Sequence, residues 1–332
     1  MRLGRARWLR LAVAALCGLL SSAGRADAPL TLVLNWVPGA DHAPFFYALR
    51  EGWYARAGIV LSIESVAGSP EAIKRAAQTP ATLAVADFVS YLRARSSLPG
   101  TTAVLALQPL SPYAVYFSAT SGIAGAQDLA GKRIAVQPQD PMRRLWPVLA
   151  QRNGIATGNV TWVDRSNAQK PDALLAGEAD AAFNPFLHNH LNYAAVLGAD
   201  MRVLWWHELG FASYGQVLVA SAEAVERTPE LVRAFVTVTQ RAWAQCLAQA
   251  APCIDALLAE HPQLDRQREQ AVWELLTRLY RTSGDAPGPL GNFDPARVAL
   301  TARDLDVAFD TQTPTAGLIN TTFLDPVIRA PH

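Results

Sequence analysis

The hydrophobic positions of the chain alternate between short runs rich in Leu, Val and Ala and longer stretches with helical spacing. Short apolar runs bounded by turn residues are typical of buried strands. We predict strands over residues 30–36, 60–66, 83–86, 103–108, 114–118, 133–136, 160–163, 181–183, 203–207 and 216–221. Helical spacing predicts helices over residues 43–56, 70–77, 88–95, 141–152 and 171–177. Alternating strands and helices indicate an α/β protein with parallel sheets.

Two breaks divide this pattern, at residues 108–112 and 211–215. They enclose a segment of ordinary domain size, so we expect two lobes. Lobe 1 would contain residues 27–107 and 216–332, and lobe 2 residues 108–215. A chain that leaves one lobe and returns crosses twice, and two crossovers form a hinge that can close over a ligand. Beyond residue 228 the spacing is almost all helical, with helices expected over 230–249 and 267–280 and a further one beginning at Pro295.

The first residues have the three-part layout of a secretory signal. Four arginines precede the apolar run 11–20, and small residues lead to Ala26. We predict a signal peptide over residues 1–26, and therefore a periplasmic protein. An uncleaved N-terminal anchor is the alternative, although the run is shorter than the ~20 residues that a membrane span needs.

Charge and cysteine usage exclude several classes of function. The chain has 29 Lys and Arg against 28 Asp and Glu, scattered rather than clustered, so we expect no binding of nucleic acid. Cys246 and Cys253 would form a disulfide in an oxidising compartment, or else remain two separate buried thiols. His188 and His190 are two residues apart, which points them away from each other on a helix, and we expect no metal site.

The candidate binding residues follow predicted strands, where open α/β sheets place their ligands. Asn35 and Trp36 follow the first strand. An indole face stacks on a planar ring and an amide pairs with its edge, although a core tryptophan beside a turn asparagine would have the same sequence. His42 would either donate a hydrogen bond to a ring nitrogen or cap the next helix. Asp87 would either cap a helix or accept from an exocyclic amine.

Further candidates come from the segment between the two breaks. Gln137 precedes a predicted helix, and the neighbouring Asp140 places a negative charge at that helix start. This charge favours a neutral or weakly cationic ligand over an anion. Asn184 follows a strand and precedes an aromatic residue, as Asn35 does. Three residues near the second break complete the candidate set, where the alternatives are core packing or exposure to solvent: Trp205, Glu208 and Tyr214.

Several of these segments also resemble a known family. The opening loop contains Asn35, Trp36, Pro38, His42 and Pro44, and the likeness continues through residues 84–87, 93–95, 121–136 and 229–243. The chain is similar to the periplasmic binding proteins of the thiamine-pyrimidine-precursor group, which are related to the sulfonate and taurine binding proteins. The resemblance implies a two-lobed type II binding-protein fold. It also implies a small heteroaromatic ligand between the lobes and delivery to an ABC permease in the inner membrane. Gly39 and the segment 137–141 depart from the group's usual loops.

Other functions stay open at this point. One is binding of an aliphatic sulfonate, taurine or another small solute, and another is a surface adhesion module. A third is an exported pyrimidine-making enzyme, because some relatives use pyridoxal phosphate on a lysine. The lysines here are Lys74, Lys132 and Lys170, and none follows the first motif at a position typical of a site. The chain lacks a Gly-x-Ser-x-Gly nucleophile motif, a phosphate loop and a zinc-protease motif. We therefore expect a monomeric binding protein with no catalytic residues and no cofactor.

Overall fold

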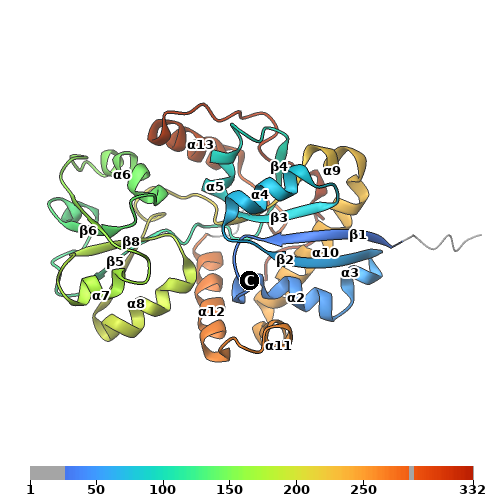
Figure 1. The fold of residues 1–332 in the computed structure, drawn as a ribbon, viewed down its shortest axis with the longest axis horizontal. Coiled ribbons are helices and arrows are strands. Elements are labelled where there is room, and N and C mark those ends of the chain that lie inside the picture. The colour runs from blue at the N-terminus through green and yellow to red at the C-terminus, as the bar shows by residue number, and fades with distance from the viewer. Residues whose placement is uncertain (1–26, 284–287, 332) are drawn as a thin grey trace, which may run out of the picture.

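The computed structural model describes residues 27–283 and 288–331 and contains two five-stranded sheets with helices on their faces (Figure 1). The predicted signal segment, residues 1–26, lies outside the described residues. The first sheet has the strand order β2-β1-β3-β10-β4. Its strands are β1 (Ala28–Leu34), β2 (Ile59–Ser65), β3 (Thr82–Asp87), β4 (Thr101–Ala106) and β10 (Gln216–Ser221). The second has the order β7-β6-β8-β5-β9. Its strands are β5 (Ala114–Ser118), β6 (Arg133–Val136), β7 (Thr161–Asp164), β8 (Ala181–Asn184) and β9 (Met201–Trp205). We call the sheets with their helices the first and second lobes.

Both sheets are mixed, so the prediction of parallel sheets was wrong for two strands. β1 runs parallel to β2 and β3, and β6 runs parallel to β7 and β8. β10 is antiparallel to β3 and β4, and β5 is antiparallel to β8 and β9. Each reversed strand follows a direct crossover from the other lobe. It therefore begins where its neighbours end: Gln216 pairs with Asp87, and Ala114 pairs with Asn184.

The helices of the first lobe are α2 (Ala43–Arg50), α3 (Trp53–Arg56), α4 (Ser69–Gln78), α5 (Phe88–Ala94), α9 (Ala222–Arg227), α10 (Pro229–Ala248) and α11 (Ala250–Glu260). Those of the second lobe are α6 (Pro141–Arg152), α7 (Lys170–Leu175) and α8 (His190–Leu197). Helices α12 (Arg266–Thr282) and α13 (Pro295–Phe309) lie between the lobes in Figure 1. The short 3-10 turns are η1 (Ala40–His42), η2 (Ala126–Leu129), η3 (Leu187–Asn189), η4 (Gly198–Asp200) and η5 (Thr321–Phe323).

Local sequence explains several helix boundaries. Asp140, Asp265 and Asp294 each precede a helix, and each side chain accepts a hydrogen bond from the backbone N–H of its first turn. The single helix predicted over residues 43–56 is instead two helices, α2 and α3. Gly52 lies between them with φ of +67°, a left-handed conformation that interrupts the helix and is cheap only for glycine.

The two crossovers run side by side and are hydrogen-bonded to each other. Gly215 N–H donates to the Gln108 carbonyl at 3.0 Å, and Ser111 N–H donates to the Ser213 carbonyl at 2.8 Å. A Cβ at residue 215 would lie 2.4 Å from Gln108 Oε1 and 2.9 Å from the Leu110 carbonyl oxygen. This close approach of the two segments requires glycine there.

Helix α13 contacts both lobes. It lies between α5 and α6 at the top of Figure 1. Arg152 of α6 pairs with Asp304 of α13 at 2.8 Å, and the Asp304 side chain is almost fully buried. Two guanidinium groups lie over the Phe309 ring at the end of α13. Cζ of Arg93 from α5 is 4.4 Å from the ring centroid, and Cζ of Arg144 from α6 is 5.4 Å from it. Helix α13 therefore packs against helices of both lobes, α5 of the first and α6 of the second.

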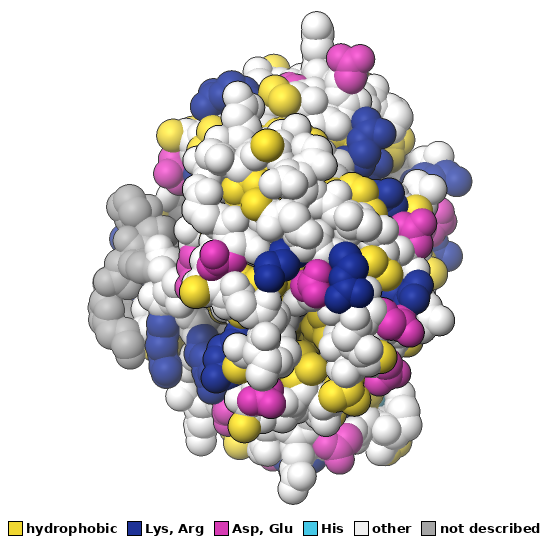
Figure 2. Space-filling view, turned by 90° about the vertical axis from the view of Figure 1, so that its left-hand side faces the viewer, with side chains coloured by type: hydrophobic (Ala, Val, Ile, Leu, Met, Phe, Trp, Pro, Cys, Tyr) yellow, Lys and Arg dark blue, Asp and Glu magenta, His cyan; other side chains and the backbone are white. Residues whose placement is uncertain are grey.

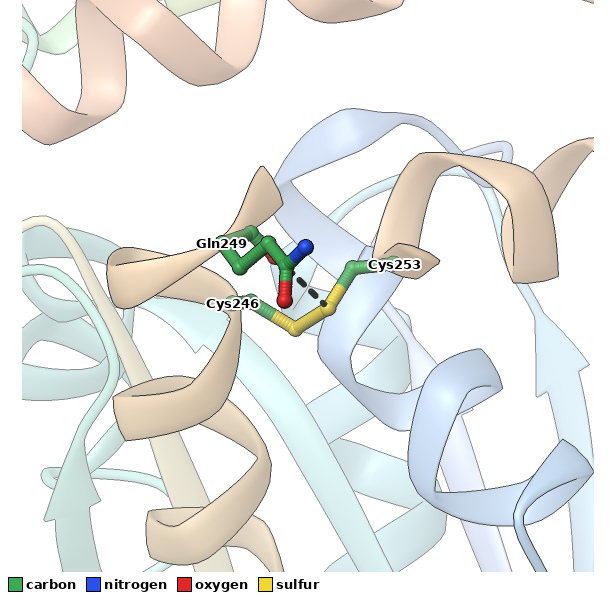
Figure 3. The surroundings of a disulfide bond; sticks show 3 residues. All are labelled: Cys246, Gln249 and Cys253. Atoms are coloured by element: carbon green, nitrogen blue, oxygen red, sulfur yellow. Dashed lines mark hydrogen bonds between the residues drawn. A yellow bond between two sulfur atoms is a disulfide. The ribbon is translucent and has the colours of Figure 1, made fainter. Parts of the chain in front are cut away.

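A disulfide joins α10 to α11, which confirms the predicted pairing of Cys246 and Cys253 (Figure 3). Their Cα atoms are 5.8 Å apart, an ordinary disulfide separation, and both residues are fully buried. Sγ of Cys253 also lies 4.0 Å from the carbonyl oxygen of Gln249. The bond fixes the sharp turn between the two helices against α2.

The described helices include no membrane span, and the face drawn in Figure 2 carries charges of both signs. Among the described helices, none combines the length and the apolar character that crossing a bilayer requires. Figure 2 shows the outer face of the second lobe, where basic and acidic side chains are interspersed.

Candidate functional site

A cleft of about 430 Å³ lies between the two lobes, within the volume range of small-molecule sites. The first lobe contributes the loop after β1, the start of α4, the end of β3 and the start of β10. The second lobe contributes the residues just before β5, the start of α6 and the loop after β8. The first turns of α12 complete the cleft. Residues used below that line it are Asn35, Trp36, Pro38, Asp41, His42, Ser69, Asp87, Tyr113, Pro185, Phe186, His188, Gln216, Arg268 and Glu269.

One side of the cleft floor is a hydrogen-bonded chain from β1 to β3. Asn35 Nδ2 donates to Ser69 Oγ at 3.1 Å, and the backbone N–H of Asp87 donates to the same hydroxyl at 2.9 Å. Asn35 Oδ1 is buried and has no hydrogen-bond partner within the described residues. This oxygen is therefore an acceptor that the protein itself leaves unused at the cleft.

Asp87 has the helix-capping role, one of the two that its sequence position allowed. Its Oδ1 accepts from Ser90 N–H at 2.8 Å and from the Ser90 hydroxyl at 2.9 Å, which caps α5. The residue also lines the cleft, where the Tyr113 hydroxyl lies 3.5 Å from Oδ1. Burial raises the pKa of Asp87 to about 6, although its hydrogen bonds from Ser90 and Tyr113 act in the opposite direction.

The other side of the floor joins Asp41, Gln216 and Glu269. Gln216 Nε2 donates to Asp41 Oδ2 at 2.8 Å, which fixes the amide orientation and leaves Gln216 Oε1 buried and unpaired among the described residues. Glu269 Oε2 accepts from the backbone N–H of Ala40 at 2.6 Å. Glu269 is buried, and burial raises the pKa of its carboxyl. A helix from the C-terminal part of the chain thus brings a third carboxylate to the cleft.

His42 is buried beside these carboxylates. It is 1% exposed and lines the cleft, and neither ring nitrogen has a hydrogen-bond partner within the described chain. It occupies the residue before α2 but its side chain makes no capping bond, so the capping alternative does not hold. Burial lowers the pKa of His42 against the raising effect of Asp41, whose Oδ1 is 3.5 Å from Nδ1. A neutral imidazole there offers one donor and one acceptor to a bound molecule.

Aromatic side chains form opposite walls of the cleft. Trp36 from the first lobe is 50% exposed and Phe186 from the second lobe is 43% exposed. The Phe186 ring lies 5.7 Å from that of His188 in a near-parallel arrangement. Large apolar rings that line a cleft and stay half exposed are surfaces that a flat ligand would cover.

Asn184 supports the second wall from behind. It is fully buried and does not line the cleft. Its Nδ2 donates to the Phe186 carbonyl at 2.7 Å, and its Oδ1 accepts from Asn189 Nδ2 at 3.0 Å. Asn184 therefore holds the loop that presents Phe186, rather than contacting a ligand in this conformation.

Among the described residues that line the cleft, Arg268 supplies the one guanidinium group. Its Nη2 donates to the His188 carbonyl and to Asn192 Oδ1, both at 3.1 Å. These contacts tie the start of α12 to the second lobe. Arg268 thereby connects α12 to the second lobe, and its neighbour Glu269 connects the same helix to the first lobe.

The structure brings together Asn35, Trp36, His42 and Asp87 from the predicted set, and places the other five elsewhere, Asn184 behind the second wall and four more as follows. Gln137 is half-buried beyond the cleft lining, and Glu208 is exposed, its Oε2 accepting from the Trp205 N–H at 3.0 Å. The ring of Trp205 stacks near His190 and His207. Tyr214 is buried against Phe88 and Phe293, and its hydroxyl accepts from Asp294 N–H at 2.7 Å.

Sequence reasoning missed Asp41, Gln216, Arg268 and Glu269 as cleft residues. Asp41 lies in the loop that carries Asn35 and His42, so its position was a usable signal. Gln216 begins a strand, whereas most candidates were sought where strands end. Arg268 and Glu269 belong to an amphipathic helix whose local pattern indicates only packing.

Within the described residues, no group of three His, Cys, Asp or Glu side chains is arranged to hold a metal ion. None of the three lysines lines the cleft. Lys170 is fully buried in the second lobe, where Nζ donates to the Phe183 carbonyl at 2.7 Å and to Asn167 Oδ1 at 2.8 Å and lies 3.6 Å from Asp140 Oδ2. Asp140 is also buried, so its charge is directed at Lys170 rather than at the cleft.

A protein-family model described as NMT1/THI5 like matches residues 39–251, more than half of the chain. The chain belongs to the NMT1/THI5-like family. This family match begins within the first cleft loop and includes both crossovers and the second lobe, so it covers most of the cleft lining but not Asn35, Trp36, Arg268 or Glu269.

Relatives of this NMT1/THI5-like chain include binding proteins and an enzyme. The riboflavin-binding protein RibY of Chloroflexus aurantiacus is 24% identical over 239 residues, 70% of this chain and 67% of the relative. The formylaminopyrimidine-binding protein of Halalkalibacterium halodurans is 23% identical over 267 residues, 77% of this chain and 79% of the relative. The 4-amino-5-hydroxymethyl-2-methylpyrimidine phosphate synthase of Legionella pneumophila is 24% identical over 246 residues, 74% of this chain and 77% of the relative.

Solved structures confirm the fold of the NMT1/THI5-like chain. The periplasmic aliphatic sulphonate binding protein SsuA of Escherichia coli superposes with a TM-score of 0.70 at 15% identity, covering 92% of this chain and 94% of SsuA. The desulfurization enzyme DSZB superposes with a TM-score of 0.55 at 16% identity, covering 89% of this chain and 97% of the enzyme. The two-lobed type II fold is therefore confirmed, and it is shared by binding proteins and enzymes.

Proposed function

We propose that the protein is the periplasmic receptor of an ABC importer and binds a small heteroaromatic solute related to the thiamine pyrimidine precursor. The observation that carries the proposal is the composition of the cleft. Half-exposed aromatic rings from opposite lobes flank a buried floor of hydrogen-bond acceptors. A flat ring with amino substituents matches both features, because its faces stack on aromatic side chains and its N–H groups donate to acceptors.

The residues divide this recognition between them. Trp36 and Phe186 would cover the faces of the ring as the lobes close. Asp87 would accept from an exocyclic amine, and Asn35 Oδ1 and His42 would pair with the ring edge. Two curated relatives carry the names of a flavin-binding and a pyrimidine-binding protein, which supports a nitrogen heterocycle.

Sulfonate binding fits the cleft poorly. Among the described residues, three carboxylates line it against one guanidinium, whose Nη2 donates two hydrogen bonds to protein oxygens. A sulfonate would be repelled by the carboxylates and would find few free donors. The likeness to SsuA extends to the fold, at 15% identity, and does not supply these donors.

An enzyme of the pyrimidine-making type would need a lysine at the cleft to hold its aldehyde cofactor, and the three lysines lie elsewhere. The described cysteines are joined in a disulfide, so the described chain offers no free thiol nucleophile. These placements favour a receptor. An absorbance scan of the protein mixed with pyridoxal phosphate tests the alternative, since a lysine-bound aldimine band would contradict our proposal.

Calorimetry decides the class of ligand. We expect 4-amino-5-hydroxymethyl-2-methylpyrimidine, or a close analogue, to bind, and taurine and an alkanesulfonate to show no heat of binding. The replacement Trp36→Ala should weaken pyrimidine binding, whereas Trp53→Ala, which changes an indole away from the cleft, should not. Tight sulfonate binding without binding of any heterocycle would overturn the ligand assignment. Native mass spectrometry of protein purified without refolding would identify a co-purified solute.

A further inference from the structure

The polar groups of the cleft are strongly biased toward hydrogen-bond acceptors. Asp41, Asp87 and Glu269 each place a carboxylate at the cleft. The amide oxygens of Asn35 and Gln216 are buried there with no partner in the described chain. Buried acceptors without partners carry a desolvation cost, and a bound molecule that supplies donors would remove this cost.

The formal charge of the cleft is also negative. Three carboxylates face one guanidinium, and the two histidines, His42 and His188, are held toward their neutral forms because burial lowers their pKa. No lysine lines the cleft. None of the three carboxylates forms an ion pair with Lys or Arg among the described residues; only the 3.5 Å approach of His42 to Asp41 is close to one.

The carboxylates already have hydrogen bonds from neutral donors only. Asp87 accepts from Ser90, Asp41 accepts from the Gln216 amide, and Glu269 accepts from the Ala40 N–H. These bonds orient the oxygens without cancelling their charge. A neutral ligand would leave the charges uncompensated in a site that closure removes from water, where such charges are costly.

Resting on the function proposed above, we infer that the solute is an organic cation: a flat heterocycle with a protonated amine or an amidinium-like group bound by Asp41, Asp87 and Glu269. The aromatic walls favour the same class, because a cationic ring or side group gains from lying over an indole face. His42 and the free amide oxygens of Asn35 and Gln216 then pair with the remaining N–H groups of the ligand.

A matched pair of ligands tests the inference. The hydroxymethyl group of 4-amino-5-hydroxymethyl-2-methylpyrimidine is neutral, whereas the aminomethyl group of its 5-aminomethyl analogue is protonated near neutral pH. We expect calorimetry to show at least tenfold tighter binding of the aminomethyl compound. A second pair, 4-aminopyridine and aniline, makes the same comparison with the charge on the ring.

Isosteric variants locate the charge preference. Glu269→Gln keeps an oxygen for the Ala40 N–H, and Asp87→Asn keeps a good helix cap, so each removes charge with little change of shape. We expect each to reduce the aminomethyl over hydroxymethyl preference severalfold. Glu274→Gln is the matched control, an exposed glutamate on the same helix. Circular dichroism would confirm that the variants are folded, and Asp41→Asn offers a third test if one of them is not.

The outcomes separate the inference from the proposed function. Equal affinity for both members of each pair, or a preference for the neutral member, overturns the cation inference and leaves the heterocycle receptor standing. An unchanged preference in all three variants overturns the assignment to these carboxylates. If no member of either pair binds, both the inference and the proposed ligand class are wrong.

Discussion

At the scale of single residues, Asp87 shows how the site is built at the expense of stability. Its pKa is raised to about 6 in the folded protein, from an ordinary value of 3.8, because burial penalises the charged form. The folded state therefore holds the Asp87 proton more tightly than the unfolded state. As pH rises from about 4 to 6, the unfolded state ionises first and Asp87 destabilises the fold. Above about pH 6 this penalty is fully present.

This argument predicts that Asp87→Asn stabilises the ligand-free protein at neutral pH, by on the order of 1–3 kcal/mol. The two proteins should have similar stability only at a pH well below 3.8, at about pH 3, where Asp87 is largely protonated in both states. Urea unfolding at several pH values measures the difference. A difference that does not change between pH 4 and 7 would show that Asp87 is not the source. Residues kept at a cost in stability are typical of functional sites.

Several cleft residues could be predicted from the sequence, because short apolar runs show where buried strands end. Asn35, Trp36 and His42 follow β1, Asp87 is the last residue of β3, and all four line the cleft. Glu269 could not be found in this way. Its carboxylate reaches the cleft only because α12 packs against the loop 229 residues earlier in the chain, where Ala40 donates to it. Tyr214 has the same aromatic character as Trp36, and only tertiary packing distinguishes core from cleft.

At the scale of elements, the disulfide stabilises the turn between α10 and α11. It closes a loop of seven residues, for which chain entropy gives about 2 kcal/mol. We expect the double replacement Cys246→Ala and Cys253→Ala to lower the unfolding free energy by about this amount, with pyrimidine binding retained because neither cysteine lines the cleft. Chemical denaturation with and without reductant checks the value. A loss of binding in a folded variant would contradict this separation.

Helix α13 should connect the stability of the two lobes. Arg152→Ala would leave the buried Asp304 carboxylate without its guanidinium partner, which costs more than an exposed ion pair. We expect a loss of about 1–3 kcal/mol. Arg144→Ala, which removes a longer cation–π contact and two 3.4 Å hydrogen bonds, should cost less. A double-mutant cycle with Asp304→Asn isolates the pair, and additivity of the single changes would show that it contributes nothing.

The hydrophobic pattern predicted the positions of the strands correctly, but it did not predict the direction of two of them. All ten predicted strands overlap observed strands, and the runs 114–118, 133–136 and 216–221 have the observed bounds. Periodicity carries no information on strand direction, so the reversal of β5 and β10 followed only from the crossovers. The helix predicted over residues 43–56 lacked the break at Gly52. A glycine within a helical pattern can continue the helix or take the left-handed conformation, and Gly52 takes the left-handed one because the chain changes direction there.

At the scale of the whole molecule, two hydrogen-bonded crossovers and a cleft between lobes predict a change of shape on binding. Trp36 is half exposed in the first lobe, and Phe186 faces the same cleft from the second. If closure covers both rings, a bound pyrimidine should shift tryptophan emission, and Trp36→Phe should lose most of that shift while the buried indoles keep the basal emission. Small-angle scattering should show a smaller radius of gyration with ligand. Ligand binding that changes neither the emission nor the radius would show that the lobes do not close, and that Trp36 does not stack on the solute.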